Sequence, residues 1–179
     1  MRITLFLFLL VAVSSVSAFA QEDIADTTVV ILVRHAEKES GQDPSLNAAG
    51  QSRALALRDS LLAYDIDVLV ASQFKRTAET LEPLATTLGL TVIVRPLESS
   101  AAAASARSVA LQLVEEFAGR TIVVAGHSNT VPAMVSALAG RPMSELDERD
   151  YDNLFIVRFA PGGEPGFLHL RYGEPDGVE

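Results

Sequence analysis

Two arginines and two histidines stand at positions that suit the chemistry of phosphate. Arg34, His35, Arg76 and His127 each come at or shortly after the end of a run of apolar residues. Guanidinium groups bind phosphate oxygens in a bidentate manner, and a neutral imidazole can attack phosphorus as a nucleophile. If the fold brings these side chains together, they could bind a phosphoryl group and accept it covalently.

The elements that must position them follow from the pattern of apolar residues. Buried, β-branched strands are predicted at 28–33, 67–71, 91–94 and 121–125. Helices are predicted between and after them, at 47–63, 75–88, 102–117 and 130–138. This alternation is typical of a parallel sheet with helices on both faces, in which ligands bind beyond the carboxyl ends of the strands. We therefore expect the four side chains to converge at one rim of the sheet.

The last part of the chain has a different pattern of residues, with no predicted helix between its two strand-like segments. Residues 154–159 and 167–172 are strand-like and flank a turn-rich segment, 160–166 (APGGEPG). This pattern predicts a β-hairpin that adds an antiparallel strand at one edge of the sheet. The predicted fold class is α/β, a three-layer α/β/α sandwich with a mostly parallel sheet.

The first twenty residues have the pattern of a secretory signal peptide. Arg2 precedes an apolar stretch at 3–13, and small residues follow and end in the cleavage-type sequence AFA at 18–20. The stretch is too short to span a bilayer as a helix. We expect cleavage after Ala20, an acidic leader at 21–27 and one domain at 28–179, in a periplasmic or secreted protein. Retention of the segment as an anchor is the alternative.

Composition limits the partners. The 179 residues include 14 basic and 23 acidic ones, a net charge of −9, and no cysteine. Loss of residues 1–20 would remove one arginine and no acidic residue, which makes the net charge −10. Such a surface repels nucleic acid and anionic lipid. We therefore expect no nucleic-acid partner, no stable membrane association after cleavage, and a local cationic site for any anion.

Four short motifs resemble, in order, those of the histidine phosphatase superfamily in its phosphoglycerate mutase-like branch. They are RHAE at 34–37, LNAAGQSRA at 46–54, SQFKRTAET at 72–80, and Gly126-His127. The segments after the first and third strands, 39–46 and 96–101, leave little room for the cap that many members carry. In this the chain is similar to the short phosphohistidine phosphatases. Gln73 and Phe74 depart from the Ser-Pro often found there.

The resemblance implies roles for the four side chains. It makes His35 the nucleophile that accepts the phosphoryl group, and Arg34, Arg76 and His127 the groups that bind it. It implies no metal and no cofactor. The expected activity is hydrolysis of phosphomonoesters, with a small phosphorylated molecule or a phosphopeptide as substrate.

The leaving oxygen also needs a proton. In the mutase-like branch an acidic residue follows the third strand, and Glu98 stands roughly at that place. Asp152, before the hairpin, is a further candidate. The acid phosphatase branch instead carries an aspartate directly after the second histidine, where this chain has Ser128.

Three other functions compete with this interpretation. The sequence GHSNT at 126–130 is close to a serine hydrolase elbow with Ser128 as nucleophile. Alternatively, His35 and His127 could ligate zinc, although two adjacent guanidinium groups would repel the cation. A module that binds phosphorylated ligands without turnover would need the arginines but not the nucleophile. The third histidine, His169, lies in the predicted hairpin and is interpreted as structural.

Overall fold

The computed structural model describes residues 27–175, in which strands and helices alternate up to a C-terminal hairpin. The strands are β1 (Thr28–Arg34), β2 (Val68–Ala71), β3 (Val92–Val94), β4 (Thr121–Gly126), β5 (Asn153–Phe159) and β6 (Gly166–Arg171). The helices are α1 (Ala48–Leu61), α2 (Lys75–Leu88), α3 (Ala102–Glu116) and α4 (Thr130–Ala139), with a short 3-10 helix, η2 (Ser99–Ala101), before α3.

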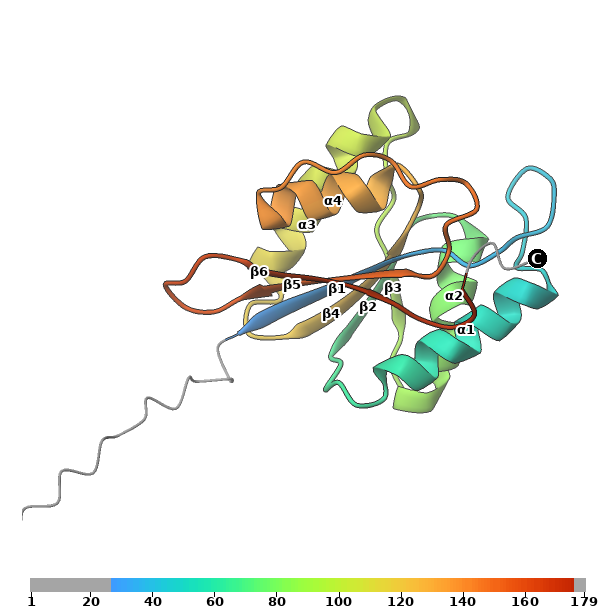
Figure 1. The fold of residues 1–179 in the computed structure, drawn as a ribbon, viewed down its shortest axis with the longest axis horizontal. Helices are drawn as coiled ribbons and strands as arrows, with labels where there is room; N and C mark the ends of the chain where they lie inside the picture. Colours follow the sequence, from blue (N-terminus) through green and yellow to red (C-terminus); the bar gives the residue numbers. More distant parts are fainter. Residues whose placement is uncertain (1–26, 176–179) are drawn as a thin grey trace, which may run out of the picture.

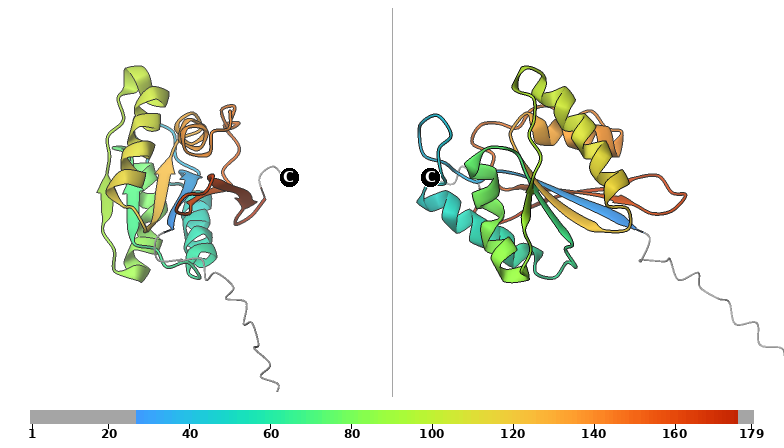
Figure 2. Two further views of the ribbon diagram at one scale, coloured as in Figure 1. Left: turned by 90° about the vertical axis from the view of Figure 1, so that its left-hand side faces the viewer. Right: turned by 180° about the vertical axis from the view of Figure 1, so that it is seen from behind.

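The six strands form one sheet in the order β3-β2-β4-β1-β5-β6. The first four strands of the chain run parallel, whereas β5 is antiparallel to β1 and β6 is antiparallel to β5. Figures 1 and 2 show α3 and α4 on one face of the sheet and α1 and α2 on the other. The predicted three-layer fold with an antiparallel edge is thus confirmed.

The apolar sequence of strand β1 follows from its burial on both faces of the sheet. Ile31 and Val33 pack in a cluster with Leu57 of α1, whereas Val30 and Leu32 pack in the cluster on the opposite face of the sheet. Side chains alternate between the two faces of a strand, and helices cover both faces here. Between Thr28 and Arg34, this central strand therefore carries only apolar residues.

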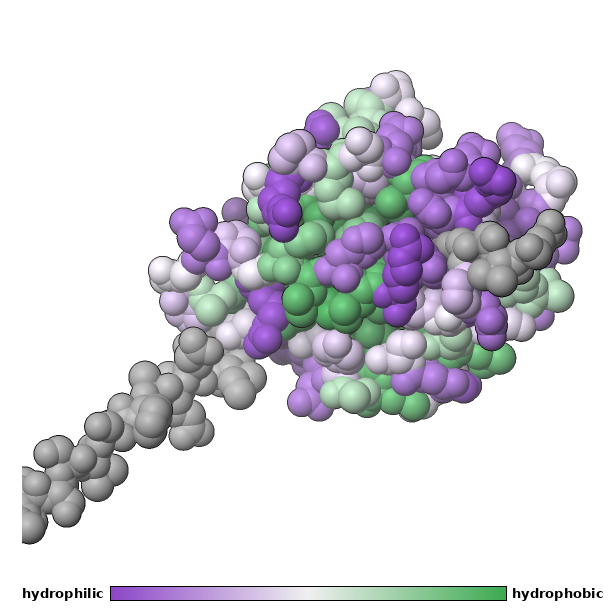
Figure 3. Space-filling model, in the orientation of Figure 1, coloured by the Kyte–Doolittle hydropathy of each residue, from purple (hydrophilic) through white to green (hydrophobic). Residues whose placement is uncertain are grey.

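Two features lie outside this core. The expected signal peptide at 1–20 and most of the leader lie outside the described residues. Within residues 27–175, no helix has the length and apolar character needed to cross a membrane. Hydrophobic side chains gather in the middle of the face shown in Figure 3. The edge strand β6 exposes Leu168 and Leu170.

Candidate active site

The carboxyl ends of β1, β2 and β4 open into one cavity of about 480 Å³. Arg34, His35, Arg76 and His127 all line it. The centroids of the two imidazole rings are 5.3 Å apart. The structure thus brings together the four side chains that the sequence pointed to, at the rim where a parallel sheet binds its ligands.

A single hydrogen bond fixes the orientation of His35. Its Nδ1 lies 2.8 Å from the carbonyl oxygen of Ala36. A carbonyl can only accept, so Nδ1 carries the proton and the neutral ring has its lone pair on Nε2. Nε2 makes no hydrogen bond to residues 27–175, which leaves this nitrogen available to a ligand.

His35 is uncharged at neutral pH. Burial is the main reason that its pKa falls to about 3, and it is lowered further by Arg34, Arg76 and the protonated form of His127, which exists in the acid range where His35 titrates. The hydrogen bond to Ala36 acts in the opposite direction but is outweighed. A neutral imidazole is the form in which histidine acts as a nucleophile.

His127 belongs to a hydrogen-bonded chain that continues into α2. Its Nδ1 lies 3.4 Å from Nη2 of Arg76, which can only donate, so the ring proton is on Nε2. Nε2 therefore donates to Ser72 Oγ at 2.9 Å, and Ser72 Oγ lies 3.0 Å from Oγ1 of Thr77. Burial and the charge of Arg76 lower the pKa of His127 to about 4, so this ring is also neutral.

Each arginine rests against an aromatic ring. The guanidinium carbon of Arg34 lies 4.1 Å from the ring centroid of Tyr151, and that of Arg76 lies 4.5 Å from the centroid of Phe74. The Nε atoms of both arginines are buried and have no hydrogen-bond partner within residues 27–175. Unpaired buried donors are rare, because they lose their hydration without replacement. Two of them beside one cavity indicate a site that is built for an anion.

Asp43, in the loop before α1, supports Arg76 from outside the cavity. Its Oδ1 accepts a hydrogen bond from the backbone nitrogen of Lys75 at 3.0 Å and lies 3.8 Å from Nη1 of Arg76. Asp43 has a φ of 101°, an unusual conformation for a residue other than glycine. The N-cap residue of α2, Phe74, makes no side-chain cap hydrogen bond. The carboxylate of Asp43 accepts a backbone hydrogen bond at this end of the helix in its place.

The other motif residues hold the loop after β1 in place. Thr80 Oγ1 accepts from the backbone nitrogen of Ala36 at 2.9 Å and donates to the carbonyl of Arg76 at 2.6 Å. A Cβ on Gly50 would lie 2.0 Å from the carbonyl oxygen of Glu37, so α1 can approach this loop only with glycine there. These residues position His35 and Arg76 relative to each other without lining the cavity.

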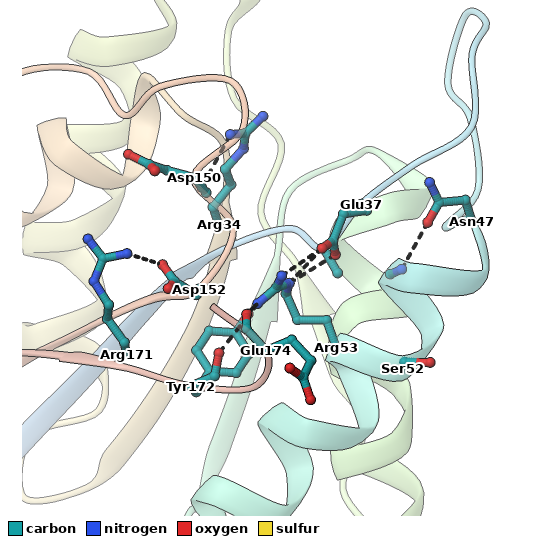
Figure 4. Close-up of polar contacts among 12 residues, drawn as sticks. Arg34, Glu37, Asn47, Ser52, Arg53, Asp150, Asp152, Arg171, Tyr172 and Glu174 are labelled. Atoms are coloured by element: carbon teal, nitrogen blue, oxygen red, sulfur yellow. Dashed lines mark hydrogen bonds and ion pairs between the residues drawn. The ribbon is translucent and has the colours of Figure 1, made fainter. Parts of the chain in front are cut away.

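Glu37 forms a structural ion pair. Both of its carboxylate oxygens accept from Arg53 Nε, at 2.9 and 3.0 Å, and the buried Arg53 also donates to the main chain of Tyr172 and Glu174 (Figure 4). Breaking a buried pair leaves an uncompensated charge, which is strongly destabilising. Glu37 therefore joins the loop after His35 to α1 and to the end of the chain.

The candidate proton donors lie less centrally. Glu98 is exposed, and its Oε1 accepts from Ser100 Oγ at 3.1 Å, although its neighbours Leu97 and Ser99 line the cavity. Asp152 is buried and accepts from Arg171 Nη1 at 2.5 Å, on the β6 side of β5 (Figure 4).

Within residues 27–175, no histidine is hydrogen-bonded to the side chain of Ser128, as a serine nucleophile would require. Ser128 lines the cavity, but the neighbouring His127 donates its ring proton to Ser72. His169 lies on β6, hydrogen-bonded to Asn153 and stacked on Phe155, as expected of a structural residue. Among residues 27–175, no three His, Cys, Asp or Glu side chains group closely enough to hold a metal ion.

The sequence analysis missed several residues of this site. Glu145 and Glu148, from the loop between α4 and β5, line the cavity, and Arg34 Nη1 donates to the carbonyl oxygen of Asp147 in the same loop at 2.7 Å. The available signal was the dense run of acidic residues at 145–152, which follows α4 after residues 140–144. The departure from the motif at Gln73 has a structural reason. The side-chain amide of Gln73 donates to the backbone carbonyl of Leu97 and accepts from its backbone N–H.

The neutral state of His35 has a consequence for stability. The unfolded chain takes up a proton on this residue near pH 6.5, whereas the folded protein does so only near pH 3. The unfolded chain therefore binds more protons between these values, and stability is lost as the pH falls through this window. Between about pH 7.5 and about pH 5, we expect the free energy of unfolding of the wild type to drop by about 2 kcal/mol more than that of His35→Gln. Urea denaturation at both pH values measures this difference, and parallel losses in the two proteins would contradict it.

Known proteins resemble this chain in both sequence and fold. Residues 30–97 match the family model of the histidine phosphatase superfamily (branch 1). A mycobacterial glucosyl-3-phosphoglycerate phosphatase has a similar structure, with a TM-score of 0.61, 16% identity, and coverage of 74% of this chain and 90% of that chain. The protein histidine phosphatase SixA, solved with tungstate, gives a TM-score of 0.63, 18% identity, and coverage of 80% and 96%. No curated protein sequence matches the chain. At these identities the structural neighbours establish the fold.

Proposed function

Because the chain belongs to the histidine phosphatase superfamily, whose model its residues 30–97 match, we propose that it hydrolyses phosphomonoesters through a phosphohistidine on His35. The observation that carries this proposal is the state of the His35 ring. Its Nδ1 is hydrogen-bonded to Ala36, its Nε2 makes no hydrogen bond to residues 27–175, and its low pKa keeps the ring uncharged. Beside it, two arginines have buried Nε atoms without partners.

In the first step, Nε2 of His35 attacks phosphorus in line with the ester oxygen. The new N–P bond forms as the P–O bond to the leaving group breaks, and the alcohol departs with a proton. Arg34 and Arg76 stabilise the charge on the equatorial oxygens, and they are positioned for this before the substrate arrives. In the second step, the oxygen of water attacks phosphorus as the N–P bond to Nε2 breaks, and the proton that water loses returns to the group that protonated the alcohol. Phosphate leaves, and His35 is again neutral.

His127 changes its protonation when the phosphoryl group binds. The charge of Arg76 contributes to the low pKa of this ring, and a phosphoryl dianion offsets that charge. Binding therefore favours protonation at Nδ1, the atom that faces Arg76. His127 then donates a hydrogen bond from Nδ1 to a phosphoryl oxygen, while Nε2 stays bonded to Ser72.

We propose Glu98, in its protonated carboxylic acid form, as the proton donor to the leaving oxygen. Its neighbours Leu97 and Ser99 reach the cavity, and Gln73 fixes the backbone at Leu97. The side chain of Glu98 is held by Ser100 on the exposed side. Proton delivery therefore requires this side chain to turn away from Ser100 and into the cavity.

Export remains part of the proposal. It is supported by the signal-peptide pattern at residues 1–20. Substrates are then phosphomonoesters that occur outside the cytoplasm.

A panel of phosphomonoesters assayed in excess chelator tests the function. We expect hydrolysis of an aryl phosphate to continue at an undiminished rate with chelator present, because the two arginines supply the positive charge that a metal would otherwise provide. Vanadate and tungstate should inhibit competitively, because the same arginines bind oxyanions. Loss of activity that zinc restores would indicate a metal hydrolase. Inhibition by an organophosphonate, with no effect of vanadate, would indicate a serine hydrolase.

A further inference from the structure

The active-site cavity carries opposite charges at its inner and outer ends. Arg34 and Arg76 line it beside the nucleophile, whereas Glu145 and Glu148 line it from the loop between α4 and β5. Lys38 is the remaining charged residue of the lining, and it is exposed. A ligand that fills this cavity therefore meets cations around its phosphoryl group and carboxylates farther out.

The acidic side of the cavity is tied to the phosphate-binding side. Leu146, between the two glutamates in the sequence, donates its backbone N–H to the carbonyl oxygen of Ser128 at 3.0 Å. Arg34 Nη1 donates to the carbonyl oxygens of Asp147 and Asp150, at 2.7 and 3.3 Å. Five residues of chain are thereby anchored at three points, which positions Glu145 and Glu148 relative to the phosphate subsite.

Neither glutamate is neutralised by the protein itself. Within residues 27–175, Glu145 and Glu148 take part in no ion pair and no side-chain hydrogen bond. Both side chains are exposed. Their charge is therefore available to a ligand.

We propose that the leaving group of the substrate carries a cationic nitrogen, so that the substrate is the phosphomonoester of a small amino alcohol. This inference rests on the proposed phosphatase function. The phosphoryl group would bind the arginines, and the ammonium group would bind the carboxylates of Glu145 and Glu148. The net charge of −9 also favours a zwitterion over a polyanion during approach. A cavity of about 480 Å³ has the size of a small-molecule site.

Two matched substrates test the inference, because 2-aminoethyl phosphate and 2-hydroxyethyl phosphate differ by one ammonium group in place of a hydroxyl. We expect the wild type to hydrolyse the amino compound with a kcat/KM about fivefold higher, the effect of a solvent-exposed ion pair at its upper end. In Glu145→Gln/Glu148→Gln this ratio should fall to about one. The control Glu115→Gln/Glu164→Gln removes the same charge away from the cavity and should keep the wild-type ratio.

The outcomes separate this inference from the function on which it rests. Hydrolysis of neither compound, nor of any aryl phosphate, would contradict the phosphatase function itself. Equal kcat/KM values in the wild type, or a ratio that the double variant leaves unchanged, would overturn the cationic substrate and leave the phosphatase intact. A basic phosphopeptide hydrolysed more efficiently than 2-aminoethyl phosphate would overturn it as well, because the carboxylates would then recognise a protein. Tungstate inhibition of the double variant shows whether its phosphate subsite is still folded.

Discussion

His35→Ala is expected to lower kcat on an aryl phosphate by at least about 10⁴-fold, the range in which removal of a nucleophile falls. In the proposed mechanism, Nε2 of His35 forms the new bond to phosphorus, and this nitrogen makes no hydrogen bond to residues 27–175. The Nε2–H group of His127 donates a hydrogen bond to Ser72 Oγ, and its Nδ1 faces the guanidinium group of Arg76. The loss corresponds to about 5 kcal/mol of transition-state stabilisation. Steady-state kinetics with circular dichroism as a check on folding measures it.

His169→Ala is the matched control. This residue is also a histidine with a hydrogen-bonded ring, but it lies on β6 and pairs with Asn153. Its replacement should leave kcat per folded molecule close to the wild-type value. Substantial activity in folded His35→Ala would show that the phosphoryl group is transferred to another acceptor.

Arg76→Ala should lower kcat/KM by about 10²- to 10³-fold, as is typical when one preorganised donor is removed from an anionic transition state. The guanidinium group of Arg76 is held in the site by three contacts. It is hydrogen-bonded to His127, packs against the ring of Phe74 and lies near the carboxylate of Asp43. Arg34 cannot compensate, because its Nη1 is occupied by the carbonyls of Asp147 and Asp150. The kcat/KM value for an aryl phosphate and the inhibition constant of vanadate should both change.

Two variants separate charge from geometry at this position. Arg76→Lys keeps the charge but loses the planar fork, so it should recover only part of the activity. Lys75→Ala removes the preceding cation, which is exposed, and its backbone bond to Asp43 survives the substitution. We expect Lys75→Ala to have the kcat/KM of the wild type. A loss of kcat/KM as large as that of Arg76→Ala would indicate that the overall positive electrostatic field, and not direct binding by Arg76, stabilises the transition state.

The elements of this fold could be predicted because each has a strong local signal. The β-branched runs that form β1, β2 and β4 are buried on both faces, so their sequences contain no polar interruption. The turn-rich segment APGGEPG likewise indicated the hairpin of β5 and β6. The order of parallel strands then placed the polar residues that follow them at one rim.

The less predictable parts of the site depend on contacts between segments distant in the sequence. The loop at 141–152 has neither apolar periodicity nor a motif, and only the fold shows that its carbonyls bind Arg34 and that Glu145 and Glu148 reach the cavity. Asp43 is 32 residues from Lys75, whose backbone it caps. Glu98 was identified by its approximate place after the third strand, and a loop sequence cannot show which way such a side chain points.

The central claim is that a phosphoryl group is carried on Nε2 of His35. The most direct test is to mix the enzyme with an aryl phosphate, quench within the first turnover under acid-free conditions, and identify the modified residue by mass spectrometry. The account predicts one phosphoryl group on the peptide that contains His35, with ³¹P NMR assigning it to Nε2, and no such group in His35→Ala. An active enzyme that releases phosphate with His35 unmodified, or with the phosphoryl group on Ser128, would contradict it.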